Sequence, residues 1–568
     1  MHLRATEVKF AFLLALLIPA LLMGQNATGA GTITGRVTDA TGAVVSDATI
    51  TVTDTETNIA NTTASNASGI YIFENVKPGI YTVEASKPGF RKSVVAKQEV
   101  TPAAALTLNF SLEVGAVTET VQVQASAEAE LQTLNSTMGS DMGGATIMNL
   151  PTINRDVAGL VFLQATSSPT FNGAESNITS GQIAGNPSDQ NTYLLDGGNN
   201  TDDMDGDRGT YVGSRSGVVP TPVESVEEFR VNTNNMTADF ATSGGGQVIV
   251  TTKRGTNQFH GSAYDFFQSS DLAANDFYNN FYDEGKPASH YNRFGGSIGG
   301  PMLPDFLGGK TYFYTNYEGE RYPRSGPLYS AVPSDLLRQG IFQIRDQSGN
   351  IVQYNLATSS VCGANGNTPC DPRGTGMSPA ISTLWNKYMP EPTSPICPGV
   401  GDGLNTECYA ANLAYPLSTN FAVVRVDHDF GSKWRFFGSY RYFSEDNPTT
   451  NQVDIGGIVS GDKLGVPASQ SSFPLEPRYF VSGITTTITP SLNNEFHFSY
   501  TKNFWQWDRL GAANQQLPGV PAAINMPGDA GQGSDLVPMN DDTQNTRPVS
   551  YTHLTPHGLP SLRRGAGR

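Results

Sequence analysis

The sequence has few cysteines and few positive charges for its length. Four cysteines occur among 568 residues, and 35 Lys and Arg stand against 52 Asp and Glu, which gives a formal net charge of −17. A nucleic-acid binder needs a basic surface, so this balance argues against a nucleic-acid partner. The excess of acid is greatest between residues 115 and 257.

Motifs for metal binding and hydrolysis are also missing. The sequence has no His-Glu-x-x-His, no His-x-x-Glu and no Cys-x-x-Cys, which are the spacings of common zinc sites. Residues 295–299 match the Gly-x-Ser-x-Gly elbow of hydrolases, but they lie in a predicted strand followed by Pro301, where the elbow needs a helix. We therefore expect no enzyme and no cofactor.

The cysteines are clustered. Cys362, Cys370, Cys397 and Cys408 lie in one stretch rich in Pro, Gly and Asn. In an exported chain, their even number and clustering favour two disulfides in one loop, with Cys362–Cys370 and Cys397–Cys408 as the local pairing. A zinc site is the alternative, although no His lies between residues 362 and 408.

Long apolar runs are confined to the start of the chain. Residues 1–24 combine Arg4 and Lys9 with the apolar run Phe10–Met23. This run is too short to span a bilayer and has the length of a secretory signal peptide. We expect the chain to be exported, and no Cys follows Gly24 to carry a lipid anchor.

Residues 31–114 consist of short β-branched runs separated by turn residues. The expected strands are Ile33–Val37, Ala48–Thr53, Gly69–Phe73, Tyr81–Ala85 and Leu106–Leu112. Such spacing predicts a small Greek-key β-sandwich. The series Gly35-Arg36-Val37-Thr38-Asp39, Gly69-Ile70-Tyr71 and Pro78-Gly79-Ile80-Tyr81 resembles the carboxypeptidase-regulatory-like fold.

Four separated segments occur in an informative order. They are Leu194-Leu195-Asp196-Gly197, Ser225–Val231, Ser243–Asn257 and Phe259-His260-Gly261-Ser262. In order and spacing they resemble the junction of plug and β-barrel in TonB-dependent outer-membrane receptors, especially the Oar-like branch. The resemblance implies an α/β plug domain in residues 115–257, preceded by the sandwich.

Between these two domains lies a polar, β-branched run. The resemblance implies a TonB box here, and its contact residues would be Glu119, Thr120, Val121, Gln122 and Val123. Recognition by strand addition needs a segment that can leave its own domain and offer a free backbone edge. The alternatives are the first strand of the plug or a plain linker.

An Asp- and Asn-rich loop follows Leu195. We expect it to face substrate at the plug apex, through Asp196, Asn199, Asn200, Asp202, Asp203 and Asp205. The spacing Asp203-x-Asp205-x-Asp207 also suggests calcium, but Arg208 and Ser214 occupy positions where an EF-hand loop needs Gly and Glu.

Residues 258–549 repeat amphipathic strands. The expected strands are Phe259–Gln268, His290–Gly299, Thr311–Gly319, Phe421–Phe430, Lys433–Phe443, Arg478–Thr489 and Glu495–Trp507. In Lys433–Phe443, one face carries Trp434, Phe436, Tyr440 and Tyr442, and the other Lys433, Arg435, Ser439 and Arg441. Short and long connections alternate. Both patterns predict a transmembrane antiparallel β-barrel rather than a soluble sandwich.

The expected barrel is partial. A large receptor barrel has about 22 strands, whereas seven to ten fit here, so we expect a C-terminally truncated fragment. Residues 550–568 are basic, which suggests an atypical, non-native tail.

In sum, the sequence predicts a mainly β outer-membrane receptor that imports an unidentified substrate. Its partners would be TonB, with its inner-membrane energising complex, and outer-membrane lipid. The alternative is a surface adhesion or structural protein without transport.

Overall fold

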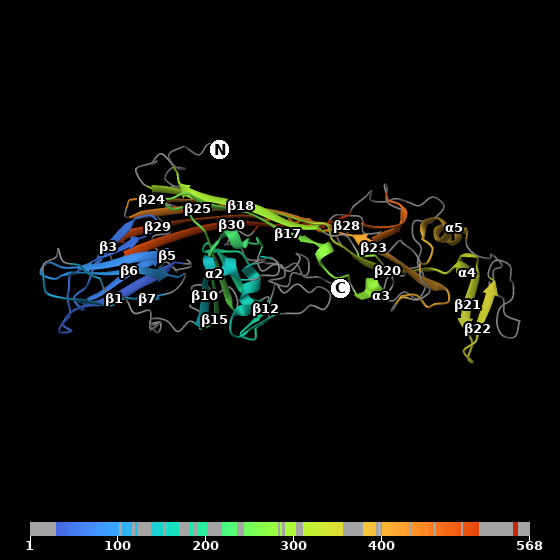
Figure 1. The fold of residues 1–568 in the computed structure, drawn as a ribbon, viewed down its shortest axis with the longest axis horizontal. Coiled ribbons are helices and arrows are strands. Elements are labelled where there is room, and N and C mark those ends of the chain that lie inside the picture. The colour runs from blue at the N-terminus through green and yellow to red at the C-terminus, as the bar shows by residue number, and fades with distance from the viewer. Residues whose placement is uncertain are drawn as a thin grey trace, which may run out of the picture.

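The computed structural model describes residues 30–509 and 549–554, with internal gaps that are longest at 123–137, 170–180, 202–217, 236–243 and 356–378. Nearly all regular elements are strands, arranged in an N-terminal sandwich, an inner domain, a long curved sheet and a unit built from loops (Figure 1). Among the described helices, none has the length and apolarity to cross a bilayer.

The N-terminal sandwich comprises two sheets. One has the order β4-β1-β7, with β8 also paired to β1, and the other has the order β3-β2-β5-β6-β9. The bounds are β1 Gly31–Asp39, β2 Thr49–Asp54, β3 Ala60–Ala64, β4 Ile70–Val76, β5 Gly79–Ser86, β6 Lys92–Val100, β7 Ala105–Thr107, β8 Phe110–Leu112 and β9 Thr120–Gln122. Alternate side chains such as Ile33, Ile50 and Val83 are fully buried between the sheets. The predicted strands are present, except that Leu106–Leu112 is divided into the two short strands β7 and β8, and β3 and β6 are additional.

The inner domain covers residues 138–252. Its sheet has the order β10-β15-β16-β13-β14, in which β13 and β16 run parallel. The bounds are β10 Met138–Gly143, α2 Gly144–Asn149, the 3₁₀ helix Val157–Leu163, β11 Ser167–Pro169, β12 Gly181–Ile183, β13 Thr192–Leu195, β14 Gly198–Asn199, the 3₁₀ turn Val223–Ser225, β15 Val226–Asn234 and β16 Gln247–Thr252. The domain lies against the concave side of the long sheet (Figure 1).

The long sheet contains all seven predicted barrel strands. Its order is β17-β18-β19-β24-β25-β29-β30, and neighbours are antiparallel. The bounds are β17 His260–Ser269, β18 His290–Pro301, β19 Lys310–Tyr322, β24 Leu417–Phe430, β25 Trp434–Asp446, β29 Arg478–Thr489 and β30 Leu492–Arg509. The short strands β28 Ser471–Ser472 and β31 Val549–Leu554 also pair with β30.

The two faces of the long sheet differ as the alternation predicts. The outer face leaves large apolar side chains 36 to 50 % exposed, including Phe294, Tyr317, Val424, Tyr440, Phe480, Phe496 and Phe498. The inner face is partly apolar, which is a departure from the expected polar lining. Phe421, Val423, Phe443 and Val481 join the core of the inner domain, because that domain occupies the concave side.

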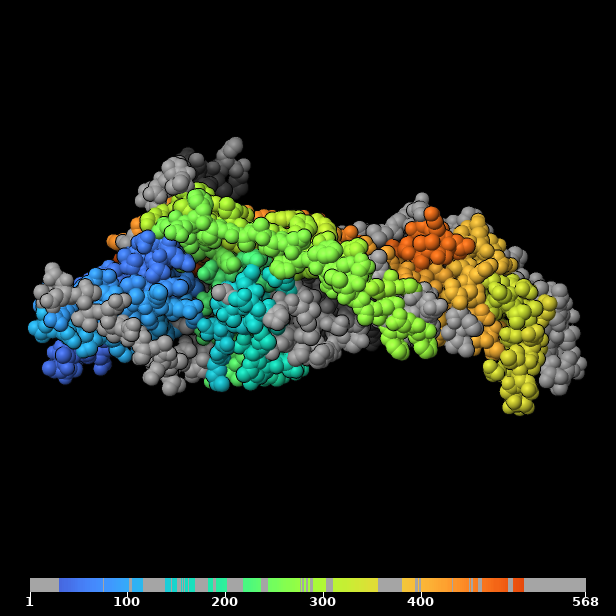
Figure 2. Space-filling model, in the orientation of Figure 1, coloured from blue at the N-terminus to red at the C-terminus, as the bar shows by residue number. Residues whose placement is uncertain are grey.

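Two long connections fold together instead of forming separate loops. The sheet β20-β23-β27-β26 takes two strands from each connection. The bounds are β20 Ser325–Pro333, α4 Asp335–Arg338, β21 Ile341–Arg345, β22 Ile351–Asn355, α5 Pro379–Tyr388, β23 Thr406–Ala414, β26 Val453–Gly456 and β27 Leu464–Ser469. Leu337, Leu384, Trp385 and Ile455 share one buried core. We call this the loop unit; it lies at the far end of the sheet from the sandwich (Figure 2).

The expected tail begins with a strand. β31 occupies Val549–Leu554 and pairs with residues 502–507 of β30. Residues 555–568, like the expected signal peptide at 1–24, lie outside the described residues.

Candidate functional site

A tight turn brings Asp196 to the wall of the long sheet. Leu195 pairs with Gly198, and the two residues between them, Asp196 and Gly197, have φ angles of 49° and 79°. Positive φ at both positions is the signature of a two-residue type I′ hairpin, for which Asp-Gly is a preferred sequence. The turn places the Asp196 carboxylate between strand β16 of the inner domain and the inner face of the long sheet.

That carboxylate is held by two arginines of the long sheet. Arg425 Nη1 donates to Asp196 Oδ1 at 3.1 Å, and Arg441 Nη2 donates to Oδ2 at 2.9 Å. Thr252 adds its amide and its hydroxyl, both at 2.8 Å. All four residues are buried. Removing one partner of a buried ion pair costs more than the pair contributes, so this arrangement fixes the docked position of the inner domain.

Arg425 also binds a second carboxylate. Its Nε and Nη2 donate to Asp427 at 2.7 and 3.1 Å, a bidentate geometry on the same strand. Residues i and i+2 of a strand share a face, so Asp427 also points inward. We name the set Asp196, Thr252, Arg425, Asp427 and Arg441 the charged lock.

A glycine lets the hairpin approach the wall closely. A Cβ on Gly198 would lie 2.2 Å from the Tyr479 hydroxyl oxygen and 2.9 Å from the Ser499 Cβ. Tyr479 uses that hydroxyl to donate to the Leu195 carbonyl at 2.9 Å. The second glycine of the Asp-Gly-Gly sequence is therefore required by contact with the barrel wall, independently of the turn.

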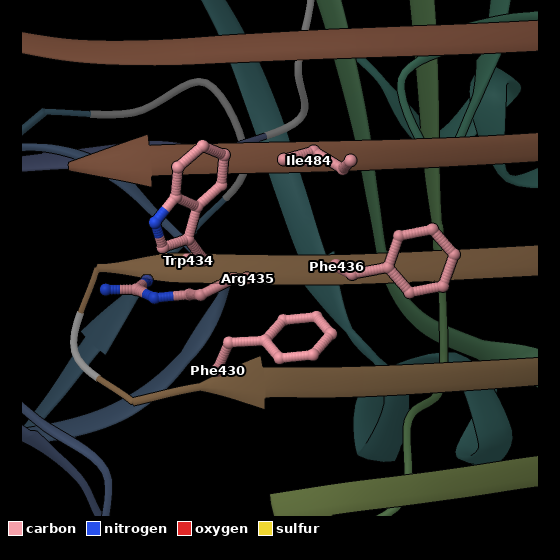
Figure 3. A pocket seen from close by; sticks show the side chains of 5 residues that line it. All are labelled: Phe430, Trp434, Arg435, Phe436 and Ile484. Atoms are coloured by element: carbon pink, nitrogen blue, oxygen red, sulfur yellow. The ribbon is translucent and has the colours of Figure 1, made fainter. Parts of the chain in front are cut away.

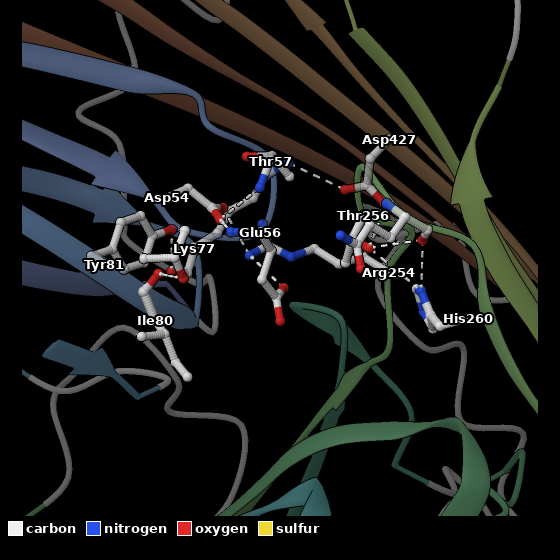
Figure 4. A network of polar contacts seen from close by, with 12 residues as sticks. Asp54, Glu56, Thr57, Lys77, Ile80, Tyr81, Arg254, Thr256, His260 and Asp427 are labelled. Atoms are coloured by element: carbon white, nitrogen blue, oxygen red, sulfur yellow. Dashed lines mark hydrogen bonds and ion pairs between the residues drawn. The ribbon is translucent and has the colours of Figure 1, made fainter. Parts of the chain in front are cut away.

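The N-terminal sandwich contacts the same region. Arg254 Nη2 lies 2.9 Å from Asp54 Oδ2 and 3.8 Å from Glu56 Oε2, and Lys77 Nζ lies 3.2 Å from Asp427 Oδ1 (Figure 4). Burial raises the pKa of the Glu56 carboxyl, and Arg254 opposes that rise. The charged lock is thus connected to all three bodies: the inner domain, the long sheet and the sandwich.

A second contact secures the 3₁₀ turn at Val223–Ser225. Tyr314 donates its hydroxyl hydrogen to the Glu224 carbonyl at 2.9 Å, and Asn316 Nδ2 donates to Ser225 Oγ at 2.7 Å. The Glu224 carboxylate accepts from Ser262 at 3.3 Å and lies 4.0 Å from Lys253. The inner domain is therefore anchored at two separate places on the sheet.

Carboxylates gather where the inner domain faces the sandwich. Burial, together with the nearby charges of Asp141 and Glu99, raises the pKa of Glu228 to about 9. Glu99 belongs to the sandwich strand β6, whereas Asp141 lies on β10 and Glu228 on the adjacent strand β15, where they pair with Arg230 and Gly143. At neutral pH, Glu228 is therefore protonated, which avoids a buried negative charge.

A shallow apolar hollow lies on the outer face of the sheet. It has a volume of about 590 Å³ and is lined by Phe430, Trp434, Arg435, Phe436 and Ile484 (Figure 3). These residues come from the ends of β24 and β25 and from β29. The hollow contributes to the apolar outer surface and has no polar side-chain cluster that would orient a small-molecule substrate.

The residues predicted to face substrate are divided by the structure. Asp196 is buried in the charged lock, and Asn200 is buried with its side chain bonded to both the amide and the carbonyl of Val219 at 3.0 Å. Asn199 accepts from the Thr201 amide. The three side chains therefore make contacts within the protein, and the turn directs Asp196 at the inner face of the long sheet. Asp202, Asp203 and Asp205 lie outside the described residues, as does the calcium-like spacing.

The predicted TonB contact segment is partly described. Thr120, Val121 and Gln122 form β9, which pairs parallel with Lys92–Val94 of the sandwich. Glu119 and Val123 lie outside the described residues. The backbone of this segment therefore extends the edge of the sandwich.

Other predicted residues lie away from the lock. Cys397 and Cys408 form a disulfide with a Cα–Cα distance of 5.7 Å in the loop unit, whereas Cys362 and Cys370 fall outside the described residues. Ser297 of the hydrolase-like motif lies inside strand β18. Among the described residues, no group of three or more His, Cys, Asp or Glu side chains is placed to hold a metal ion.

Local patterns in the chain indicate only part of the lock. Strand alternation correctly assigns Arg441 to the inner face, but no pattern pairs it with Asp196, 245 positions away. Arg425, Arg254 and Lys77 were not predicted. The only available signal was an arginine between valines, Val424-Arg425-Val426, because a charge on the inner face of a strand needs a partner.

Comparisons with known proteins agree with this architecture. Residues 251–553 match the family model described as outer membrane beta barrel domain, and residues 32–113 match the carboxypeptidase regulatory-like domain. The chain is 25 % identical over 313 residues to the TonB-dependent transporter Oar of Myxococcus xanthus, covering 53 % of this chain and 28 % of that protein.

Solved structures give a more distant likeness. The siderophore receptor PirA from Acinetobacter baumannii matches with a TM-score of 0.37 and 13 % identity, over 65 % of this chain and 40 % of that one. A mutant of the ferric enterobactin receptor PfeA from Pseudomonas aeruginosa matches with a TM-score of 0.38 and 10 % identity, over 73 % and 44 %. The chain spans less than half the length of each of these relatives.

Proposed function

The chain belongs to the outer membrane β-barrel domain family, and we propose that it acts as a TonB-dependent receptor of the outer membrane. Its inner domain would be the plug, and TonB would supply energy for import of a substrate. Similarity to the TonB-dependent transporter Oar over 53 % of the chain supports this reading.

The observation that carries the proposal is the charged lock. A domain that blocks a pore must be held firmly at rest and still be removable. The ion pairs of Asp196 with Arg425 and Arg441 meet that need. A buried ion pair requires a specific geometry, and the free-energy cost of removing its charges from water offsets much of the attraction between them.

Energy would enter through the segment at residues 119–123. Residues 120–122 of this segment form the edge strand β9 of the sandwich, and the chain continues from there to the inner domain, so a pull on the segment acts on both. Strand addition would let TonB bind the backbone there, with side-chain pockets giving specificity. The substrate would meet the plug apex and the loop unit.

The first experiment tests TonB binding without any substrate. Val121→Pro removes a backbone donor from the segment, so binding to the purified periplasmic domain of TonB, measured by calorimetry, is expected to be lost. Val121→Ala is the matched control and should retain binding. Equal affinities for the proline variant and the wild type would contradict the proposal.

A second experiment separates transport from adhesion. Deleting Thr118–Ala125 should abolish growth on whichever iron chelate, oligosaccharide or peptide the intact gene supports, and a protonophore should have the same effect. Deleting Ser126–Thr133, an equal length of the same linker, is the control. Surface adhesion that persists in cells without any uptake phenotype would favour the adhesion alternative.

A further inference from the structure

The sandwich docks on the end of the long sheet through several independent polar contacts. Besides the Arg254–Asp54 ion pair, Lys310 Nζ donates to the Thr57 carbonyl at 2.9 Å, and the Asn257 amide donates to the Glu56 carbonyl at 3.2 Å. The side chains of Arg254 and Asp54 are 9 % and 7 % exposed. Charges buried this deeply between separate domains indicate a defined docked state.

The docking contact shares a carboxylate with the charged lock. Lys77 of the sandwich binds Asp427 Oδ1, and Arg425 binds both oxygens of the same group while also binding Asp196 of the inner domain. The lock and the docking contact are also connected through the backbone. Thr252 belongs to the lock, and Arg254, two residues later, contacts the sandwich.

We propose that the N-terminal sandwich is a latch on the end of the long sheet, and that its docking is coupled through Asp427 to the seating of the inner domain. Displacing Asp196 would loosen the sandwich, and releasing the sandwich would weaken the hold on Asp196. Such coupling is reciprocal by thermodynamic necessity. The inference rests on the proposed function in one respect: it takes the inner domain as the part of the protein that moves.

The charges determine the sign of the coupling. The connected cluster holds three cations, Lys77, Arg425 and Arg441, and two carboxylates, Asp196 and Asp427. Withdrawing Asp196 leaves one carboxylate among three cations. Lys77 is the most exposed of the cations, with 22 % of its side chain accessible, so it can leave at the least cost, and the sandwich leaves with it.

Hydrogen exchange of the purified full chain in detergent tests this coupling. The reporter is the peptide at residues 253–259, whose Asn257 amide is bonded to the sandwich. Asp196→Asn touches no sandwich residue, yet it should raise exchange in this peptide about fivefold. Arg441→Gln disturbs the same lock but removes a cation, so exchange should not rise.

Controls distinguish coupling from general damage. Glu320→Gln breaks the buried Arg293–Glu320 pair, which lies outside the lock, and should leave the reporter unchanged. Lys77→Gln should raise exchange in the wild type but add little to Asp196→Asn. The inference is overturned if Asp196→Asn leaves exchange in the reporter peptide unchanged, or if Arg441→Gln raises that exchange as much as Asp196→Asn does. It is also overturned if the double variant shows the product of the two single increases, from Lys77→Gln and from Asp196→Asn.

The measurement needs neither TonB nor substrate. Loss of TonB binding would refute the proposed function while leaving the coupling intact, and a failure of coupling would leave the proposed function standing. If Asp196→Asn does not yield folded protein, Asp427→Asn serves as the second variant. It should release both Lys77 and Arg425, and an unchanged reporter would again overturn the latch.

Discussion

Arg254 and Asp54 form a buried ion pair at 2.9 Å although they stand 200 positions apart in the chain. Asp54 also accepts from the Glu56 and Thr57 amides, so it shapes the turn that carries it. One carboxylate therefore orders the edge of the sandwich and attaches it to the barrel.

Asp54→Ala is expected to destabilise the docked sandwich by about 3–5 kcal/mol, because it leaves the Arg254 charge buried without its closest partner. Urea titration followed by pulse proteolysis of the sandwich measures this loss. The double variant Asp54→Leu with Arg254→Met removes both charges and should recover much of the stability. If the double variant is as unstable as the single one, the contact acts through packing and not through charge.

Tyr479→Phe is expected to weaken the seating of the inner domain by about 1 kcal/mol, since it deletes the hydrogen bond to the Leu195 carbonyl. The readout is the urea midpoint for release of the inner domain. Tyr440→Phe is the matched control, because Tyr440 lies on the outer face of the sheet, 46 % exposed. Equal shifts for both variants would contradict a specific anchor.

The inner domain should lose stability as pH rises. Burial raises the pKa of Glu228 from 4.5 to about 9, so the folded domain holds a proton that the unfolded chain releases across this window. Stability is therefore greatest below the lower value and falls as pH rises through the window. Thermal melting at pH 5.5 and pH 8.5 should show the fall, and Glu228→Gln should reduce it. A Gln variant with an unchanged pH dependence would assign the effect to other groups.

The Cys397–Cys408 disulfide should stabilise the loop unit by about 3 kcal/mol, because it closes a short loop in the unfolded chain. The variant with both cysteines changed to Ser should be cleaved faster by trypsin within residues 323–416. The barrel sheet should keep its own resistance, which serves as an internal control. If the loop unit and the barrel sheet lost protease resistance together, the result would mean that the loop unit supports the barrel.

A charge on the outer face should impair membrane assembly. Phe498 is 50 % exposed on that face, and Phe498→Arg is expected to cost about 2–4 kcal/mol if the position lies in the hydrocarbon. Thr501→Arg, on the opposite face of the same strand, should cost less. Folding titrations in lipid vesicles compare the two, and the reverse order would invert the assigned faces.

The barrel strands could be predicted because their signal is local. Alternation within Lys433–Phe443 assigns both faces without knowledge of any neighbour, and all seven predicted strands are present. The strands β3 and β6 were not predicted, because their own sequences carry no clear alternation. Ala60–Ala64 has no large apolar residue, and Lys92–Val100 mixes polar with apolar residues, so their positions depend on pairing with β2 and β5.

The charged lock could not be derived from the sequence in the same way. We expected Asp196 to lie in a loop that faces substrate, since a loop sequence does not specify the direction in which its carboxylate points. Its orientation depends on Arg425 and Arg441, which lie on strands more than 200 positions later. Contacts between residues so far apart in the chain form only when the long sheet packs around the inner domain.

The loop unit draws strands from two separate connections of the barrel. Each connection alone would expose half of a hydrophobic core, including Trp385 from one and Ile455 from the other. Grafting a single one of these loops onto a different barrel should therefore produce an aggregating surface, whereas the two transplanted together would carry a complete small domain. Variation at this end of the sheet is constrained to pairs of segments, and an engineer who wishes to exchange the loop unit would have to move both.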